Sequence, residues 1–343
     1  MTMKRSITAA ALLAALTLGA TSPAVASVYS SSRLLIQDLT IEIGGLATPD
    51  NPRFTFTTTS SAFLNGVQSS LTTTCTGTST STDCGGPPLI LGSTNSIGTP
   101  TRNPGDFNFF GPGFGQTYAN ASSEIQNAEL VTGQPTIANQ ISEAEISGTG
   151  VGISNTQLSS NTRLSFTFDI SGDGSLDLSF LANPDLYVAV NTPNLIDAFA
   201  IARLDASFEL IGPTGQTIRW SPDGGTGGVT GCAAGLLCTA VSAERLNSVA
   251  IGLGSGNPTD NAFSDARGGD LGGSNPDPDI GFGAYGFTVD GLTNGEWTLI
   301  LASSTFAEAR QEVPEPATML LLGSGLVGLG MFAAYRRQRR TGS

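Results

Sequence analysis

The sequence predicts a mainly β fold, an antiparallel β-sandwich or jelly-roll-like domain with long loops rich in Gly, Ser, Thr and Asn. Three observations predict it. Apolar and polar residues alternate over short stretches, turn-forming residues separate these stretches, and no strong helical period continues over three turns between residues 27 and 312. Many short strands joined by Gly- and Pro-containing turns are typical of sandwiches and jelly rolls.

The alternation is clearest at 164–170 and again at 176–180, with Gly172-Asp173-Gly174 between the two stretches. We expect these stretches to form a hairpin. Similar strand patterns occur at 35–43, 54–56, 186–190, 204–210, 218–220, 287–289 and 297–301. Residues 120–147 fit neither the strand nor the helix period. We expect loops over 59–118 and 254–281, where Ser, Thr, Gly, Pro and Asn dominate.

The composition restricts the chemistry of the protein. The net charge is −13, histidine is absent and Lys4 is the sole lysine. An acidic surface repels phosphate backbones, so we expect no nucleic-acid partner. The missing His and Lys exclude Ser-His-Asp and Cys-His nucleophile systems, His-ligated metals and Schiff-base catalysis in the middle of the chain. Carboxylate catalysis is still allowed, but the composition favours a protein that is not an enzyme.

Residues 1–26 have the three parts of a secretory signal peptide. Lys4 and Arg5 are the positive region, 7–20 is an apolar stretch, and Ala24-Val25-Ala26 is a small-x-small cleavage site. We expect signal peptidase to cut after Ala26 and to leave a β-rich domain over 27–312. An N-terminal membrane anchor is the alternative, which Pro23 disfavours because it stands just before the cleavage site.

The region 313–340 also has three parts. Pro314, Glu315 and Pro316 precede an uncharged segment, 317–335, which as a helix spans about 28 Å and matches a bilayer core. A basic cluster follows at once. Its members are Arg336, Arg337, Arg339 and Arg340. Such a cluster holds its end of a transmembrane helix in the cytoplasm. A plain single-pass anchor, with the bulk of the chain outside, is the alternative interpretation of this region.

In combination and in this order, the three parts resemble the PEP-CTERM sorting signal of exported bacterial proteins. The resemblance covers the C-terminal region only. It implies recognition and cleavage near the Pro-Glu-Pro motif by an exosortase in the inner membrane of a Gram-negative-type bacterium. It also implies release to the cell surface or to extracellular polysaccharide. The membrane contact would then belong only to the C-terminal helix of the precursor.

Four cysteines, Cys75, Cys84, Cys232 and Cys238, lie in the region expected outside the cell. Disulfides are the default in an oxidising compartment. Four cysteines allow three pairings, and the local one joins Cys75 to Cys84 and Cys232 to Cys238. A Cys₄ zinc site is the competing interpretation, but the spacings do not fit the usual pattern of two to four intervening residues.

Two acidic runs have the oxygen ligands and glycine-rich surroundings that calcium accepts. The stronger candidate contains Asp265, Asp270, Asp277 and Asp279, and the other contains Asp169, Asp173 and Asp177. Neither has the order of acids of an EF-hand. Asp and Gly are also ordinary turn residues, so we expect no cofactor, with calcium as the one candidate.

Together these features predict an exported structural or adhesive protein associated with extracellular polysaccharide. Trp220, Trp297, Tyr285 and the phenylalanines of 107–114 are candidates for stacking on sugars. The alternatives are a secreted carboxylate-dependent polysaccharide hydrolase and a membrane-anchored binding module. No pair among the many acids stands out as catalytic.

Overall fold

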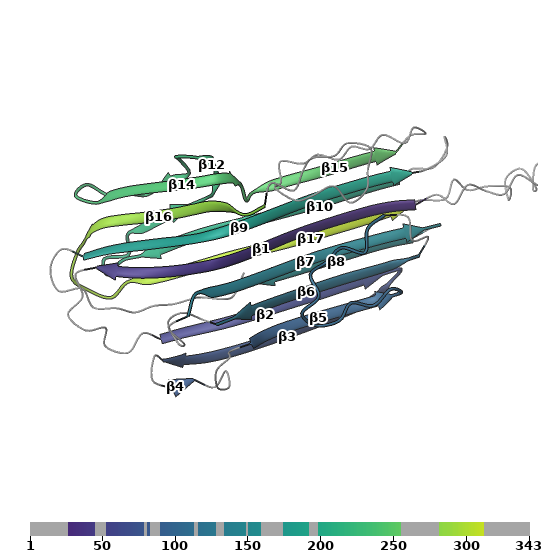
Figure 1. Ribbon diagram of the computed structural model, residues 1–343, viewed down its shortest axis with the longest axis horizontal. Helices are drawn as coiled ribbons and strands as arrows, with labels where there is room; N and C mark the ends of the chain where they lie inside the picture. The colour runs from purple at the N-terminus through teal and green to yellow at the C-terminus, as the bar shows by residue number, and fades with distance from the viewer. Residues whose placement is uncertain are drawn as a thin grey trace, which may run out of the picture.

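The computed structural model describes residues 27–44, 53–78, 81–82, 90–112, 116–127, 134–148, 150–158, 174–191, 198–254 and 281–311. They form two antiparallel β-sheets that lie face to face, with long strands running along the length of the sandwich (Figure 1). The prediction of a mainly β, sandwich-like fold is confirmed.

The first sheet, here sheet A, has eight strands. Their spatial order is β12 (Asp223–Gly225), β14 (Leu237–Arg245), β16 (Gly283–Leu292), β9 (Gly174–Asn191), β1 (Ser27–Gly44), β7 (Thr136–Ser147), β6 (Tyr118–Gln126) and β5 (Ile90–Gly98). The centre of the sheet is β1, which pairs along its length with β9 on one side and with β7 on the other.

The second sheet, sheet B, has nine strands. Eight follow the order β13 (Val229–Thr230), β11 (Thr217–Trp220), β10 (Ala198–Ile211), β17 (Thr298–Gln311), β8 (Gly150–Leu158), β2 (Arg53–Leu64), β3 (Val67–Thr78) and β4 (Ser81–Thr82). The ninth, β15 (Ser248–Gly254), pairs with β10 beside β11. The two sheets stack strand on strand, with β10 against β9, β17 against β1 and β7, and β2 against β5 and β6.

The segment 59–118 corrects our expectation of loops, because it contains the second half of β2 and all of β3, β4 and β5. A two-residue turn, Asn65-Gly66, joins β2 to β3, and both residues have positive φ, 49° and 89°. Asn-Gly is the preferred pair for a type I′ hairpin turn, which requires such angles. Threonine is itself favoured in strands. Cross-strand Thr pairs such as Thr57–Thr74 and Thr59–Thr72 are hydrogen-bonded at 3.1 Å.

The predicted strand patterns at 176–180 and 186–190 are parts of one strand, β9. Pro184 is tolerated inside it because β16 pairs with β9 only as far as Ala182, so one side of Pro184 faces no described strand and needs no N–H donor. The ambiguous segment 120–147 forms two strands, β6 and β7. The first half of the predicted hairpin, 164–173, and most of the predicted loop 254–281 lie outside the described residues.

One part of the interior is aromatic. Trp220 lies between Phe208 and Phe287, with ring centroids 4.6 and 5.5 Å away, and Phe180 stacks on Tyr285 at 5.0 Å. Trp220 and Phe287 are fully buried. Stacked and tilted ring pairs at these distances add to the free energy gained by burial alone. This cluster joins β9 and β16 of sheet A to β10 and β11 of sheet B.

The other part of the interior is polar, and small side chains connect the sheets by hydrogen bonds. Ser142 of β7 donates to the Thr305 carbonyl oxygen at 3.0 Å, and Ser32 of β1 donates to the Arg203 carbonyl oxygen at 2.8 Å. Further along, Asn95 of β5 donates to the carbonyl oxygen of Ser60 at 2.8 Å. Each of these three side chains is hydrogen-bonded to the facing sheet, so these groups avoid the penalty of an unpaired buried donor.

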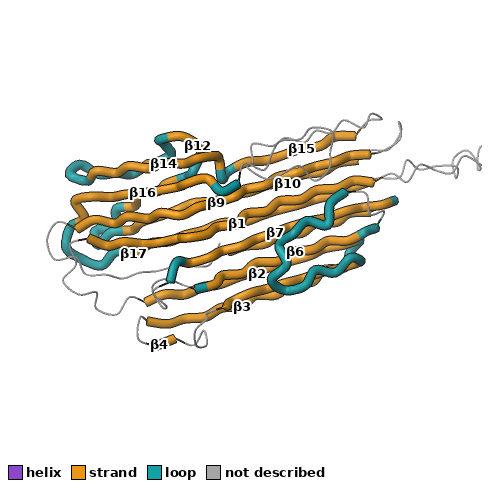
Figure 2. The backbone as a smooth tube through the Cα atoms, viewed as in Figure 1, coloured by secondary structure: helices purple, strands orange, loops and turns teal. Residues whose placement is uncertain are grey.

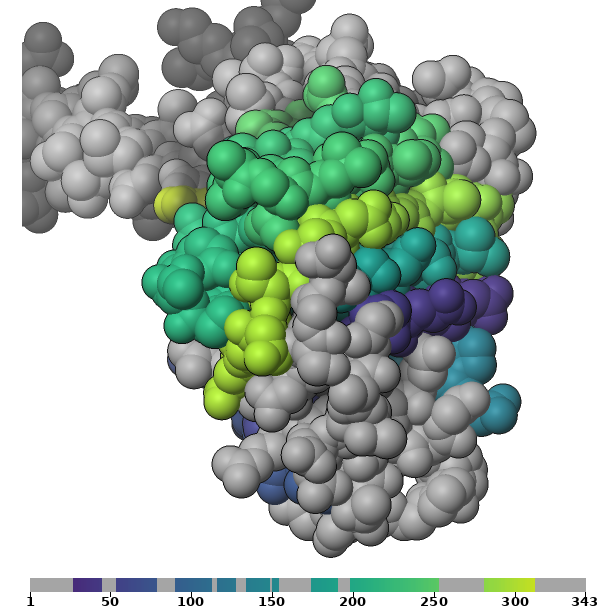
Figure 3. Space-filling view, turned by 90° about the vertical axis from the view of Figure 1, so that its left-hand side faces the viewer, coloured from purple at the N-terminus to yellow at the C-terminus, as the bar shows by residue number. Residues whose placement is uncertain are grey.

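Both ends of the described chain lie at the same end of the sandwich (Figure 1). Ser27, which opens β1, pairs with Ser147, and Gln311, which closes β17, pairs with Gly150, three residues further along the chain. The opposite end is built from the turns around β14, β16 and β17, and Figure 3 looks onto it. There a Cβ atom on Gly291 would lie 2.7 Å from the Gly235 carbonyl oxygen, so these two turns touch.

The described part of the chain contains no helix long and apolar enough to cross a membrane. The predicted signal peptide, 1–26, and the predicted transmembrane segment, 317–335, lie outside the described residues.

Candidate functional site

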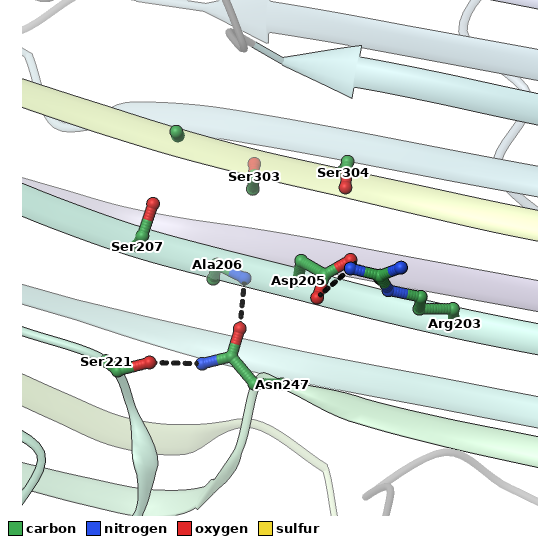
Figure 4. A pocket seen from close by; sticks show the side chains of 9 residues that line it. Arg203, Asp205, Ala206, Ser207, Ser221, Asn247, Ser303 and Ser304 are labelled. Carbon is green, nitrogen blue, oxygen red and sulfur yellow. Dashed lines mark hydrogen bonds and ion pairs between the residues drawn. The ribbon is translucent and has the colours of Figure 1, made fainter.

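A shallow pocket of about 380 Å³ lies on the outer face of sheet B. Its wall is formed by β10 and β17 together with the loop before β15 (Figure 4). The lining residues are Arg203, Asp205, Ala206, Ser207, Ser221, Asn247, Ala302, Ser303 and Ser304. The side chains that reach solvent are hydroxyl, amide, carboxylate and guanidinium groups, so the pocket can donate and accept hydrogen bonds, and none of the described residues that line it is aromatic.

Arg203 and Asp205 lie two residues apart on β10 and therefore on the same face of the strand. Their side chains form an ion pair, with Arg203 Nε 2.6 Å from Asp205 Oδ2. Both are well exposed, with 58% and 40% of the side-chain surface accessible. A pair this open to water adds little to stability, so it is available to a polar ligand.

Asn247 lines the pocket and closes a gap in sheet B. Along one edge of β10, β15 pairs as far as Leu204 and β11 begins at Phe208, which leaves Ala206 without a ladder partner there. Asn247 Oδ1 accepts the Ala206 N–H at 2.8 Å, and its Nδ2 donates to Ser221 Oγ at 2.8 Å (Figure 4). The side chain thus replaces one missing strand residue.

The aromatic residues expected to stack on sugars do not line this pocket. Trp220 and Trp297 are 0% exposed and Tyr285 is 3% exposed, so all three belong to the core. Trp297 Nε1 donates to the Thr293 carbonyl oxygen at 2.9 Å. In the segment 107–114, Phe109 and Phe110 pack under Arg33 and Arg102, with 4.7 and 4.6 Å from each guanidinium carbon to the ring centroid.

A buried charge cluster, which the sequence did not predict, lies on the outer face of sheet A. Glu143 of β7 and Arg102, from the loop after β5, form an ion pair with Nη2 to Oε2 at 2.5 Å, and both side chains are 0% exposed. Glu143 Oε1 also accepts hydrogen bonds from Tyr29 Oη at 2.6 Å and from the Phe110 and Gly111 amides at 2.9 and 3.0 Å. Every one of these groups donates, so the geometry fits an ionised carboxylate.

The cluster holds the loop 99–112 against the sheet. Arg102 donates to the carbonyl oxygens of Asp106 and Asn108 at 2.9 and 2.7 Å, which fixes the loop's own curvature. Asn120 of β6 donates to the Pro100 carbonyl oxygen at 2.9 Å. Figure 2 shows this loop crossing the outer face of sheet A over β6 and β7. Because both carboxylate oxygens of Glu143 and both Nη atoms of Arg102 are hydrogen-bonded within the protein, we interpret the cluster as structural.

Two phenols next to Glu143 have strongly perturbed acidity. Burial, and secondarily the charge of Glu143, raises the pKa of Tyr29 and of Tyr118 well above the usual value. The pKa of Glu143 is itself raised, because the effect of burial outweighs the opposite effects of the Arg102 charge and the Tyr29 hydroxyl.

We expect Tyr29 and Tyr118 to ionise only when the protein unfolds. In the unfolded chain they lose protons near pH 10, whereas the folded state keeps them, so the free energy of unfolding falls as the pH rises above about 10. Absorbance at 295 nm, followed with circular dichroism through an alkaline titration, checks this. A complete rise in phenolate absorbance while the protein keeps its native spectrum would contradict this prediction. In the Tyr29→Phe variant, one phenol fewer should ionise together with unfolding.

The structure contains the disulfide Cys232–Cys238, with a Cα–Cα distance of 6.2 Å, which confirms that prediction. Cys75 of β3 is also disulfide-bonded, and Cys84, its predicted partner, lies outside the described residues. These bonded states argue against a Cys₄ zinc site. The Cys232–Cys238 bond closes the turn that leads into β14, at the end of the sandwich seen in Figure 3.

The predicted calcium ligands Asp265, Asp270, Asp277 and Asp279 lie outside the described residues. So do Asp169 and Asp173 of the second acidic run, whereas Asp177 lies within β9 and accepts a hydrogen bond from Thr288 Oγ1 at 3.4 Å. Among the described residues, no group of three or more His, Cys, Asp or Glu side chains could hold a metal ion. The calcium site stays a prediction.

The sorting residues Pro314, Glu315 and Pro316 and the arginines after residue 335 lie beyond β17, outside the described part. No curated protein and no solved structure matches the chain. Residues 312–340, however, match the model of the PEP-CTERM protein-sorting motif, which begins directly after the last residue of β17. The chain therefore carries the PEP-CTERM sorting motif of exported bacterial proteins that are processed by an exosortase.

Proposed function

We propose that the protein is a structural or adhesive component of the cell surface or of the extracellular polysaccharide matrix, delivered there by exosortase processing. The observation that carries the proposal is the sorting motif at 312–340, attached directly to the final strand of a large β-sandwich. Because β17 ends at Gln311, cleavage near the Pro-Glu-Pro motif would leave every described strand intact.

The position of the chain ends supports this delivery route. Ser27 and Gln311 lie at the same end of the sandwich (Figure 1). A signal peptide before residue 27 and a sorting tail after residue 311 would thus both extend from one end. The opposite end, with its disulfide, would point away from the membrane until the tail is removed.

The polar pocket on sheet B supports contact with a polyhydroxylated polymer. Arg203 and Asp205 present charged groups to solvent, and Ser207 and Ser304 add hydroxyls beside them. Sugars are recognised through hydrogen bonds to such groups. In this proposal the pocket holds a short stretch of the polysaccharide, and the protein binds it without chemical change.

The delivery half of the proposal is tested in the protein's own host. We expect the wild-type protein, recovered from surface and medium, to have an intact mass lacking residues 1–26 and the segment after the Pro-Glu-Pro motif. A variant with Pro314, Glu315 and Pro316 all changed to alanine should stay in the membrane with its tail. A wild-type protein that still carries 317–335 would overturn sorting and leave an anchored ectodomain.

The binding half is tested with a matched pair of variants. We expect Arg203→Ala together with Asp205→Ala to lower the fraction of protein that co-purifies with the host polysaccharide by about tenfold, which corresponds to about 1.4 kcal/mol. The control is Arg219→Ala with Glu209→Ala, an ion pair of 3.1 Å elsewhere on sheet B. Equal retention of both variants would remove the pocket from the proposal. Release of reducing ends from the polymer would favour a hydrolase instead.

A further inference from the structure

The edge of sheet B formed by β3 is long, straight and uncharged. β3 runs over twelve residues, VQSSLTTTCTGT, with no charged side chain and no proline. Natural edge strands usually avoid pairing with other chains by charge, proline, a bulge or shortness. Of the strands that end the two sheets, β4 and β13 have two residues each and β12 has three, whereas β5 at the end of sheet A has nine.

The geometry of the β2–β3 hairpin determines which backbone N–H and C=O groups of β3 point away from β2. In a two-residue hairpin the closing pair, Leu64 and Val67, is hydrogen-bonded, and bonded pairs then alternate along the ladder. The N–H and C=O groups of every second residue thus point away from β2. These residues are Gln68, Ser70, Thr72 and Thr74, and all four are exposed.

No described strand pairs with this side of β3 between Val67 and Thr74, because β4 pairs only with Gly77 and Thr78. Figure 1 shows β3 along one edge of the molecule with β4 beside one of its ends. Two large apolar side chains of the strand are exposed as well, Val67 at 59% and Leu71 at 45%. Nearby, side chains of β3 secure it to β5, with Ser69 Oγ donating to Asn95 Oδ1 at 2.7 Å, so the edge is held rigidly in place.

The distribution of charge favours a second copy of this chain as the partner of β3. The chain has a net charge of −13, yet the 48 residues between Arg53 and Arg102 contain a single charged residue, Asp83. Two copies of an acidic protein repel one another least where their charge is absent. The edge is also self-complementary. If Leu71 faces Leu71 of the second copy, Ser70 faces Thr72 and Gln68 faces Thr74, so the outward backbone groups of both strands are paired.

We propose that β3 is a strand-addition site for a second copy of this chain, which pairs antiparallel about a two-fold axis through Leu71. The two copies of sheet B then form one continuous sheet. The pairing covers both exposed leucines, which face each other at a non-hydrogen-bonded position where side chains are closest. The turn Asn65-Gly66 and β4 bound the paired stretch at its two ends, so the register is limited on both sides.

The test uses the protein recovered from its host, in sedimentation velocity over a range of concentrations. We expect a reversible dimer that becomes tighter with added salt, because salt screens the repulsion between the acidic bodies. Leu71→Lys places two like charges opposite each other and should weaken the dimer by about tenfold or more. The matched control is Leu237→Lys on β14, another exposed leucine, at 61%, which should leave the dimer unchanged.

A second experiment checks the register. Leu71→Cys places two thiols across the two-fold axis, within reach of a disulfide, and mild oxidation should give a reducible covalent dimer in good yield, whereas Leu237→Cys should not. Circular dichroism and thermal melting of each variant show that it is folded. A monomeric wild type at high concentration, association of Leu71→Lys equal to that of the control, or equal cross-linking of the two cysteine variants would each overturn the proposal. None of these outcomes depends on whether the sorting tail has been cleaved.

Discussion

Replacing Trp220 with alanine is expected to cost about 3–5 kcal/mol of the free energy of unfolding. The side chain is 0% exposed and contacts the rings of Phe208, Phe180 and Phe287 across both sheets. Its removal leaves a cavity between two sheets whose backbones are fixed by long ladders, so the cavity cannot collapse easily. The loss should appear in urea unfolding followed by circular dichroism.

Two companion variants make this measurement specific. Trp220→Phe keeps a ring in the stack and should cost clearly less than the alanine change. Leu237→Ala alters a residue that is 61% exposed and should stay within about 0.5 kcal/mol of the wild type. If Trp220→Ala and Leu237→Ala unfold at the same urea concentration, the aromatic cluster is not the main core of the sandwich.

Changing Glu143 to leucine is expected to have a comparable effect, about 3–5 kcal/mol. The substitution leaves the Arg102 guanidinium buried without its counter-charge and removes the acceptor for Tyr29 and for the Phe110 and Gly111 amides. The loop 99–112 should then detach from sheet A. Urea unfolding measures the loss, and faster proteolysis within the loop would locate it.

A double-mutant cycle separates the ion pair from general disruption. Arg102→Met combined with Glu143→Leu removes both charges, so the double variant should be less destabilised than the sum of the single variants by more than 1 kcal/mol, as is usual for residues in one network. The exposed pair Arg203–Asp205 should show coupling of only about 0–1 kcal/mol. Strict additivity at Arg102 and Glu143 would contradict the buried network.

The sequence predicted the apolar strands well because alternation directly records which face of a strand is buried. Leu204, Ala206, Phe208 and Leu210 point inward in β10 as that pattern requires. The same reasoning failed for β3 and β5, because their inward faces mix apolar residues such as Cys75 and Leu91 with Ser, Thr and Asn, and this interrupts the alternation of apolar and polar residues. The hydrogen bonds that make such a face stable come from the other sheet and from partners far away in the chain, such as Asn95 with Ser60.

The candidate sites also differ in whether the sequence could predict them. The sorting motif could be recognised from sequence because it is contiguous, and so could the Cys232–Cys238 disulfide. The pocket and the charge cluster could not, because each joins residues from distant segments. Arg102 and Glu143 are 41 positions apart, and Ala206 and Asn247 are also 41 apart. The one local signal for the charge cluster was Glu143 and Glu145 in β7, which alternate with Ala and Ile as acids on one face of a strand.

The polar layer between the sheets also shapes how the protein responds to temperature. Unfolding exposes apolar surface, which raises the heat capacity, and polar surface, which lowers it. Ser32, Ser142, Asn95 and their neighbours are buried in positions that most sandwiches fill with aliphatic residues, so the heat-capacity change on unfolding should lie below the usual ~12–15 cal/mol/K per residue. A smaller change flattens the stability curve and moves cold and heat denaturation further apart. A protein placed outside the cell would then keep nearly the same folded fraction through the warming and cooling of its surroundings.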